Sequence, residues 1–333
     1  MLSVSLILVV LLALGFDFIN GFHDTANSIA TSVSTRVLSP RQAIIMSAIL
    51  NFVGALTSSK VANTIANGLV DSASIKVQYV IIATLIASII WDLITWYYAI
   101  PSSSSHALIG ALIGSSIAYS GGLSIVKWKG VLDKVILPLL TSPILGFAIG
   151  FLFMSILYKL LRPFSQRFVN KWFSKLQIVS AAFMAYSHGK NDAQKSMGII
   201  TLALVGANLN NGHVGVQHWV MLACALSMAF GTSIGGWKII KTIGVNMIKL
   251  QPIGGFAAET GAAVIIEVMS SFGAPVSTTQ VISTSIMGVG ASKRLSAVRW
   301  ALARNIVWAW IFTIPVTAIL GAFITTIFKI FVQ

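Results

Sequence analysis

The sequence predicts an all-α integral membrane protein with roughly ten to twelve membrane segments, some of them only half-spans. Hydrophobic residues make up 56% of the 333 residues and charged residues only 9%, whereas a soluble domain is typically about 25% charged. Two kinds of polar motif, each present once in either half of the chain, interrupt this apolar sequence. Matching interruptions in two halves predict an inverted duplication with two pairs of broken or re-entrant half-helices.

The membrane segments begin at the N-terminus of the chain. Residues 1–16 are apolar and no basic residue precedes them, so we expect a first membrane helix rather than a signal peptide. Charge-free stretches further along could each cross a hydrocarbon core of about 30 Å as one helix. They are Gln42 to Ser59, Val135 to Tyr158, Val268 to Ser292 and Asn305 to Phe328.

Two other apolar stretches are too long for a single span. They are Leu93 to Val126 and Ser196 to Trp237. Each is expected to contain two segments and a break. We place the breaks at Pro101 to Ser105 and at Asn208 to Gly212, where turn-forming and polar residues gather.

The chain divides into a first membrane repeat over residues 1–125, a connecting span and basic loop over 126–175, and a second membrane repeat over 176–333. The connector at 159–175 holds the densest group of basic residues, so we expect it to be cytoplasmic and the loop at 127–134 to be outside. Because the basic residues lie in loops rather than in one patch, the net charge of +14 does not indicate nucleic-acid binding. The single cysteine, Cys224, excludes an intrachain disulfide and a Cys-based metal site.

The first motif contains an aspartate among other polar residues, and it runs from Gly21 to Ser28 and again from Gly189 to Ser196. We expect the two glycines to let the backbone leave helical geometry and turn carbonyl oxygens inward. Carboxylate, amide and hydroxyl oxygens suit a hard cation rather than zinc or copper. The motif therefore predicts two cation sites, one per half, with the ligands Asp24, Asn27, His23 and Ser28 in the first and Asn191, Asp192 and Ser196 in the second.

The second motif is a proline followed by hydroxyl residues, from Pro101 to His106 and again from Pro275 to Gln280. Proline favours the first turn of a helix and Ser or Thr caps it, so each motif predicts a half-helix that begins inside the membrane. Helix N-termini attract anions, and two of them suit a tetrahedral oxyanion; otherwise the hydroxyls only cap a kink. The predicted anion ligands are Ser103, Ser104, Ser105, Ser277, Thr278 and Thr279, together with Thr25, Gln194 and Lys195 from the aspartate motifs, and Lys195 has the alternative of neutralising Asp192.

The four motifs, in this order, resemble the paired signatures of the PiT family of inorganic phosphate transporters, and the similarity covers nearly the whole chain. The resemblance implies phosphate import driven by a cation gradient, an inverted duplication and a homodimer in the cell membrane. Glu259 stands where the family has a functionally important glutamate, so it is a candidate for coupling or gating. His23 replaces the usual asparagine, and Gln280 replaces the usual histidine.

Members of this family use either sodium ions or protons. The Asp, Asn and hydroxyl surroundings favour sodium, whereas proton coupling needs a carboxylate or histidine that titrates during the cycle, such as His23 or His188. We therefore expect symport of phosphate with sodium ions, alternating access around a midplane site and no further cofactor. The alternatives are a proton-coupled symporter of phosphate or metal phosphate, an anion channel, and a membrane phosphatase using a pair such as Ser105-His106. The lack of a soluble catalytic domain argues against an enzyme.

Overall fold

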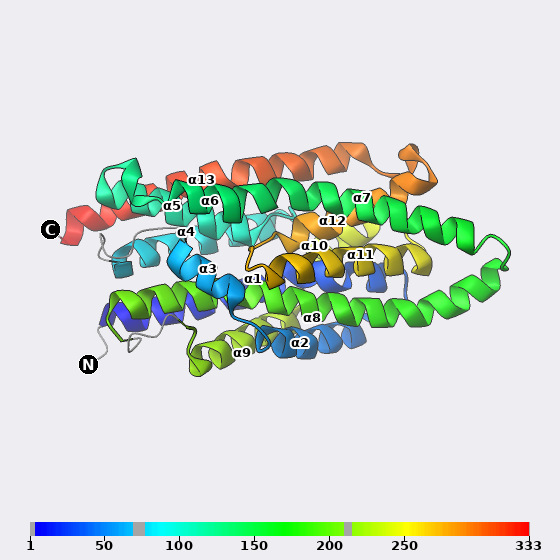
Figure 1. The fold of residues 1–333 in the computed structure, drawn as a ribbon, viewed down its shortest axis with the longest axis horizontal. Helices are drawn as coiled ribbons and strands as arrows, with labels where there is room; N and C mark the ends of the chain where they lie inside the picture. Colours follow the sequence, from blue (N-terminus) through cyan, green and yellow to red (C-terminus); the bar gives the residue numbers. More distant parts are fainter. Residues whose placement is uncertain (1–3, 69–76, 210–214, 333) are drawn as a thin grey trace.

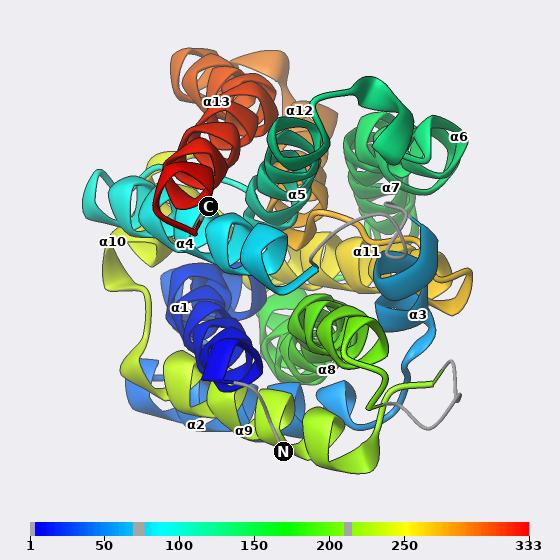
Figure 2. The ribbon, with the colours of Figure 1, turned by 90° about the vertical axis from the view of Figure 1, so that its left-hand side faces the viewer.

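The computed structural model describes residues 4–68, 77–209 and 215–332, and its regular elements are all helical (Figure 1). Several helices run along the long axis of the molecule and are seen nearly end-on in Figure 2, whereas others lie across that view. In chain order they are α1 (Val4–Ser34), α2 (Pro40–Ala55), α3 (Lys60–Gly68), α4 (Val77–Tyr97), α5 (Ser104–Ser120), α6 (Trp128–Val131), α7 (Leu137–Leu160), α8 (Gln166–Gly206), α9 (His218–Ile234), α10 (Trp237–Ile240), α11 (Pro252–Ser271), α12 (Thr278–Lys293) and α13 (Trp300–Val332). Short helical turns are η2 (Leu123–Ile125), η3 (Leu132–Ile136), η4 (Lys241–Asn246) and η5 (Leu295–Ala297).

The outside of this bundle is apolar. Ile144 of α7 is 69% exposed and Ile319 of α13 is 70% exposed, as expected of helices that face lipid. Within the described residues, five helices are long and apolar enough to cross a membrane, or up to seven if each of two bent pairs is one span. The chain is therefore an all-α membrane protein, as predicted. This number is smaller than the expected ten to twelve because that expectation included half-spans. α5 and α12 are too short to cross a membrane alone, and α8 contains many polar residues.

Both predicted breaks in the long apolar stretches separate helices. The first lies between the end of α4 at Tyr97 and the start of α5 at Ser104. The second lies between the end of α8 at Gly206 and the start of α9 at His218, although residues 210–214 are outside the described part of the chain.

Two stretches that we expected to form single spans are divided. In the stretch Gln42 to Ser59, α2 ends at Ala55, and α3 follows at an angle of 65° to it. α9 and the helical segment that begins with α10 are bent by the same angle. Val268 to Ser292 is shared between α11 and α12. A helix cannot continue smoothly through Pro275, because proline lacks the N–H group and its ring clashes with the preceding turn.

The basic connector is shorter than predicted. α7 continues to Leu160 and α8 already begins at Gln166, so most of residues 159–175 are helical and the expected boundary at residue 176 lies inside α8. Ser165 explains the early start, because its side chain accepts a hydrogen bond of 3.3 Å from the backbone N–H of Phe168 and caps the helix.

The two aspartate motifs lie within uninterrupted helices, α1 and α8. The predicted departure from helical geometry at Gly21 and Gly189 is therefore wrong. Both glycines instead allow close helix packing: a Cβ atom on Gly21 would overlap the Met228 carbonyl of α9, and one on Gly189 would overlap the Asn51 backbone of α2. Because these glycines have no side chain, each motif-bearing helix can pack closely against its neighbour while it stays continuous.

We expect Gly189→Ala to destabilise the protein by about 1–3 kcal/mol, because the added methyl group would force α8 away from α2. Gly15→Ala is the matched control, since no atom lies within 4 Å of the position of its Cβ. Alanine also has the higher helix propensity, so the control should be neutral or stabilising by up to about 1 kcal/mol. Thermal unfolding of the two purified variants measures the difference; equal melting temperatures would contradict this role of Gly189.

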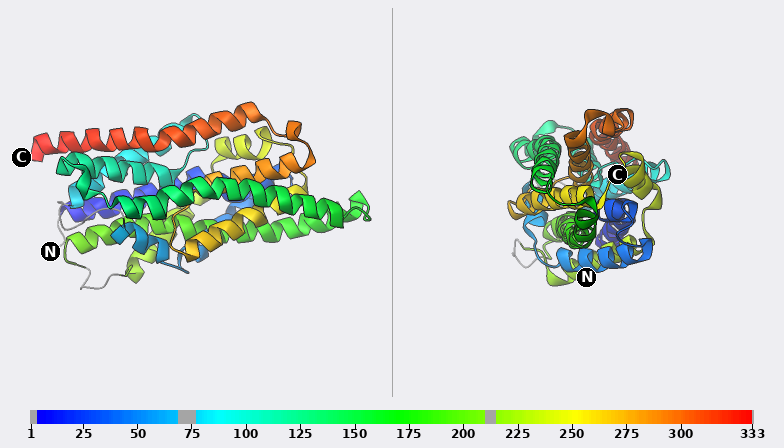
Figure 3. Two further views of the ribbon diagram at one scale, coloured as in Figure 1. Left: turned by 45° about the horizontal axis from the view of Figure 1, so that its top comes forward. Right: turned by 90° about the vertical axis from the view of Figure 1, so that its right-hand side faces the viewer.

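The helix contacts fall into two matching pairs. α1 packs on α9 as α8 packs on α2, and α5 packs on α13 as α12 packs on α7. A Cβ atom on Gly114 of α5 would overlap the Ala318 backbone of α13, so this glycine lets the two helices pack closely. α5 and α12 begin near the middle of the molecule and run to opposite ends (Figures 1 and 3). This arrangement agrees with an inverted duplication, which stays a prediction.

Candidate functional site

The two motif aspartates lie side by side in the interior. One ligand atom from each of Asp24, His188 and Asp192 falls within 4.8 Å of the others, and all three residues are buried. From the sequence we expected two separate cation sites, one per half, but the structure brings both carboxylates into one cluster. Two buried carboxylates at this separation repel each other strongly, so the cluster calls for positive charge.

Several donors surround Asp192. The Nζ atom of Lys195 lies 2.8 Å from Asp192 Oδ1, and the Lys195 side chain is only 1% exposed. Asn191 donates to the same oxygen at 2.8 Å, while Asn20 of α1 donates to Oδ2 at 3.5 Å. His188 Nε2 lies 3.5 Å from Oδ2. These contacts make α8 a source of both positive and negative charge at the same point of the bundle.

The N-terminus of α12 joins the two aspartates. Thr278 donates to Asp192 Oδ2 at 3.4 Å, and Thr279 donates to Asp24 Oδ1 at 3.5 Å. The amide of Asn27 donates to both hydroxyl oxygens, at 3.2 and 2.9 Å. Side chains of α1, α8 and α12 therefore form one continuous hydrogen-bond network.

Each proline motif starts a half-helix, as predicted. Ser103 caps α5 by accepting a 3.3 Å hydrogen bond from the backbone N–H of His106. Ser277 caps α12 in the same way, accepting a 3.3 Å bond from the N–H of Gln280. Both serines are thus N-cap residues, and the first residues of both helices are buried.

The two half-helix starts meet beside the aspartate cluster. Ser105 at the start of α5 donates to the carbonyl of Val276, which precedes α12, at 3.2 Å. Asn191 donates to the same carbonyl at 3.0 Å. The Ser104 hydroxyl is buried without a hydrogen-bond partner among the described residues, so it is available for a ligand.

Two residues that the sequence placed in the site are turned toward other helices. The Thr25 hydroxyl donates within α1 and, at 3.4 Å, to the Thr232 carbonyl of α9. The Ser28 hydroxyl lies 2.7 Å from that of Ser47 in α2. Both therefore contribute to helix packing around α1.

The side chains of Gln194 and Ser196 make no hydrogen bond to this network among the described residues. The Gln194 carbonyl oxygen accepts hydrogen bonds from the backbone N–H groups of Val61 at 2.7 Å and Ala62 at 3.2 Å, so it caps α3. The Ser196 hydroxyl is buried and has no hydrogen-bond partner in the described structure. Since the Gln194 side chain is occupied in this way, we leave it out of the anion site.

His23 contacts the same carboxylate oxygen of Asp24 that Thr279 contacts. Its Nδ1 atom lies 2.6 Å from Asp24 Oδ1, and its Nε2 atom lies 3.1 Å from the Thr95 hydroxyl of α4. Both ring nitrogens thus have partners within the protein. This arrangement orients the Asp24 carboxylate and leaves His23 without a free nitrogen for a cation.

Glu259 belongs to a separate buried group. On α11 it accepts hydrogen bonds from the hydroxyl of Thr31, from Ser180 at 2.5 Å and from the amide of Gln177 at 3.5 Å. These donors come from α1 and α8, the two helices that also carry the aspartates. A role of Glu259 in coupling or gating stays a prediction.

Asn20 and His188 are site residues that we did not predict as ligands. Asn20 precedes Asp24 by four positions, and His188 precedes Asp192 by four positions. Residues four apart share one face of a continuous helix. The spacing was visible in the sequence, but the expected breaks at Gly21 and Gly189 obscured it.

Known proteins resemble this chain over nearly its whole length. The model of the phosphate transporter family matches residues 20–321. A probable low-affinity inorganic phosphate transporter of Bacillus subtilis (strain 168) is 51% identical over 96% of either chain, and one of Mycobacterium tuberculosis (strain CDC 1551 / Oshkosh) is 43% identical over 96% of this chain and 76% of the relative. A solved structure titled "The sodium-dependent phosphate transporter" matches with a TM-score of 0.88 and 25% identity, covering 98% of this chain and 100% of that one.

These similarities include all four motifs and the helices that carry them, so the family resemblance of the motifs is confirmed. Membership of a family of transporters also agrees with the expectation that the chain is not an enzyme. The extent of the family match and the 51% identity to a full-length relative establish that this chain belongs to the phosphate transporter family.

Proposed function

We propose that the protein imports inorganic phosphate across the cell (plasma or inner) membrane by symport with sodium ions. One observation carries the proposal: two buried carboxylates meet the hydroxyl-bearing N-termini of two half-helices. Carboxylates attract cations, and helix N-termini attract anions. Placed side by side, they allow an anion and its coupling cations to compensate each other inside a low-dielectric bundle.

The side chains divide into two sets by their chemistry. Asp24, Asn27, Asn191 and Asp192 carry hard oxygen atoms that suit sodium ions. Phosphate has its donors in Ser104, Ser105, Thr278, Thr279 and Lys195. Sodium binding first would neutralise the aspartates and prepare the site for the anion. The loaded site then has little net charge, which favours its occlusion and re-exposure on the other side of the membrane.

Sodium is supported by the name of the matching solved structure, a sodium-dependent phosphate transporter. Symport of phosphate or metal phosphate with protons is the second candidate, and a different observation favours it. The carboxylate oxygens of Asp17 and Asp92 are buried and have no hydrogen-bond partner among the residues described. A buried carboxylate without a hydrogen-bond donor is costly in its charged form, so either residue is a candidate proton carrier.

The test is uptake of radiolabelled phosphate into proteoliposomes under an inward sodium gradient or an inward proton gradient. We expect concentrative uptake with the sodium gradient alone. Uptake with the proton gradient alone would replace sodium by protons and direct attention to Asp17 and Asp92. Equilibration without accumulation would indicate a channel, and hydrolysis of a phosphate ester would indicate an enzyme; either result would overturn the proposed symport.

We further propose that the protein is a homodimer, as the family resemblance implies. Native mass spectrometry of the detergent-purified protein tests this directly. A mass of one chain with bound lipid at every detergent concentration would contradict it.

A further inference from the structure

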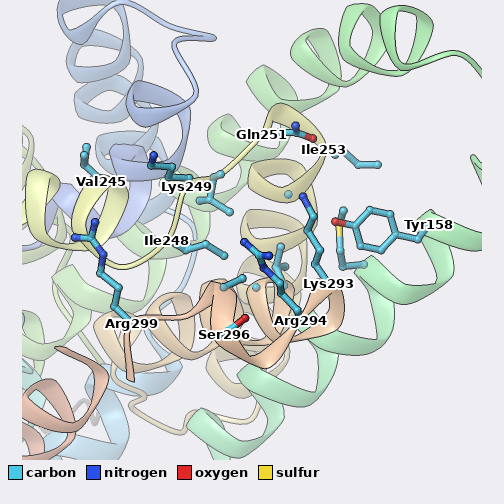
Figure 4. A pocket seen from close by; sticks show the side chains of 16 residues that line it. Tyr158, Val245, Ile248, Lys249, Gln251, Ile253, Lys293, Arg294, Ser296 and Arg299 are labelled. Carbon is cyan, nitrogen blue, oxygen red and sulfur yellow. The ribbon is translucent and has the colours of Figure 1, made fainter. Parts of the chain in front are cut away.

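A pocket of about 530 Å³ lies outside the aspartate cluster, and Figure 4 shows the side chains that line it. Its lining comes from α7, η4 and the segment that follows it, the start of α11, the end of α12, and η5. Thr278 is the first residue of α12, whereas Lys293 in the pocket is the last. The length of a half-helix therefore separates the pocket from the proposed transport site.

Four basic residues line this pocket: Lys249, Lys293, Arg294 and Arg299. Figure 4 shows Arg294 between Lys249 and Lys293, and Arg299 at the left of the view. No acidic residue lines the pocket, and none of the four forms an ion pair with a carboxylate in the described part of the chain. Four like charges around one cavity create a strongly positive potential that attracts an anion.

The remaining walls are largely apolar. Met154, Ile248, Ile253 and Val289 line the interior. Met154 belongs to α7, whose outward-facing Ile156 is 52% exposed. The pocket thus offers cationic groups and an apolar surface next to a helix that faces lipid, a combination that fits a ligand with a charged head and an apolar body.

We propose that this pocket binds a phosphate-bearing anion. An anionic phospholipid and free inorganic phosphate share that chemistry, and the apolar walls favour the phospholipid. The ends of α7 and α12 that line the pocket lie at the end of the molecule where α7 connects to α8 (Figure 3), the end that we expect to be cytoplasmic. Basic pockets between membrane helices on that side are suited to anionic headgroups.

The experiment compares two double variants of the full-length protein. Lys293→Gln/Arg294→Gln removes two charges from the pocket, whereas Arg167→Gln/Lys171→Gln removes a matched pair from exposed positions at the same end of the molecule. Native mass spectrometry from nanodiscs titrated with phosphatidylglycerol in phosphatidylcholine measures retained lipid. Equilibrium dialysis with radiolabelled inorganic phosphate counts bound phosphate.

We expect phosphatidylglycerol to bind roughly 30-fold more weakly to the pocket variant, because each removed charge contributes about 1 kcal/mol and about 1.4 kcal/mol corresponds to a tenfold change in affinity. Its binding to the control variant should be almost unchanged. Loss of one equivalent of inorganic phosphate, with phosphatidylglycerol retention unchanged, would identify free phosphate as the ligand. Identical behaviour of the two variants in both assays would overturn the proposal. Lys249→Gln/Arg299→Gln removes the other two charges and carries the same expectation if the first variant fails to fold.

Discussion

Asp24→Asn is expected to reduce sodium-driven phosphate uptake by about 100-fold or more, because it removes one of two buried charges available to the coupling cation while preserving the size of the side chain. Asp24 bonds to His23 and Thr279, and Asn can keep one contact to each. The loss should therefore come from the missing charge rather than from unfolding. Initial rates of radiolabelled uptake into proteoliposomes measure the effect.

Asp133→Asn is the matched control for this change. Asp133 is an exposed acidic residue in η3, so its replacement should leave uptake unchanged. Melting temperatures of both variants should stay close to that of the unmodified protein. Concentrative uptake by Asp24→Asn at the unmodified rate would contradict the placement of the cation at this cluster.

Lys195→Met is expected to destabilise the protein by about 3–5 kcal/mol and to abolish uptake. Removing Lys195 leaves the Asp192 carboxylate buried without the cation that lies 2.8 Å away, and breaking a buried ion pair in this way has a large cost. The same replacement also removes the only lysine of the proposed phosphate site. Thermal unfolding and proteoliposome uptake report the two losses separately.

The double variant Asp192→Asn/Lys195→Met distinguishes a structural role of this pair from a transport role. Replacing both partners leaves neither of the two as an unpaired buried charge, so most of the lost stability should return. Uptake should stay abolished, because both a cation ligand and a phosphate donor are missing. Recovery of uptake together with stability would show that the pair only holds the helices in place.

Local sequence signals were sufficient to predict where the half-helices begin. Ser103 and Ser277 follow a proline by two positions in either motif and cap α5 and α12 as expected. Capping depends on hydrogen bonds between residues a few positions apart, so the information lies within each motif. The early start of α8 at the Ser165 cap follows the same rule.

The convergence of Asp24 and Asp192 could not be read from local signals, because it depends on how α1 and α8 pack. Gly21 and Gly189 are compatible both with a helix break and with close helix contact, and only the neighbouring helices decide between them. With a break expected at each glycine, the sequence could not predict which side chains share a helix face on both sides of it. The direction of the Gln194 side chain, which caps α3 rather than entering the site, was missed for this reason.

The interleaved packing of the two halves has a consequence for how the chain is made. α1 enters the membrane early with Asn20, Asp24 and Asn27 on it, yet Asn27 reaches its α12 partner, Thr279, across 252 positions of sequence. Until that distant segment has been synthesised, the polar face of α1 lies in lipid without its partners, at a considerable cost. We therefore expect late closure of the bundle, with a membrane insertase sheltering α1 during translation. Ribosome-bound chains that stop before residue 279 should be sensitive to proteases.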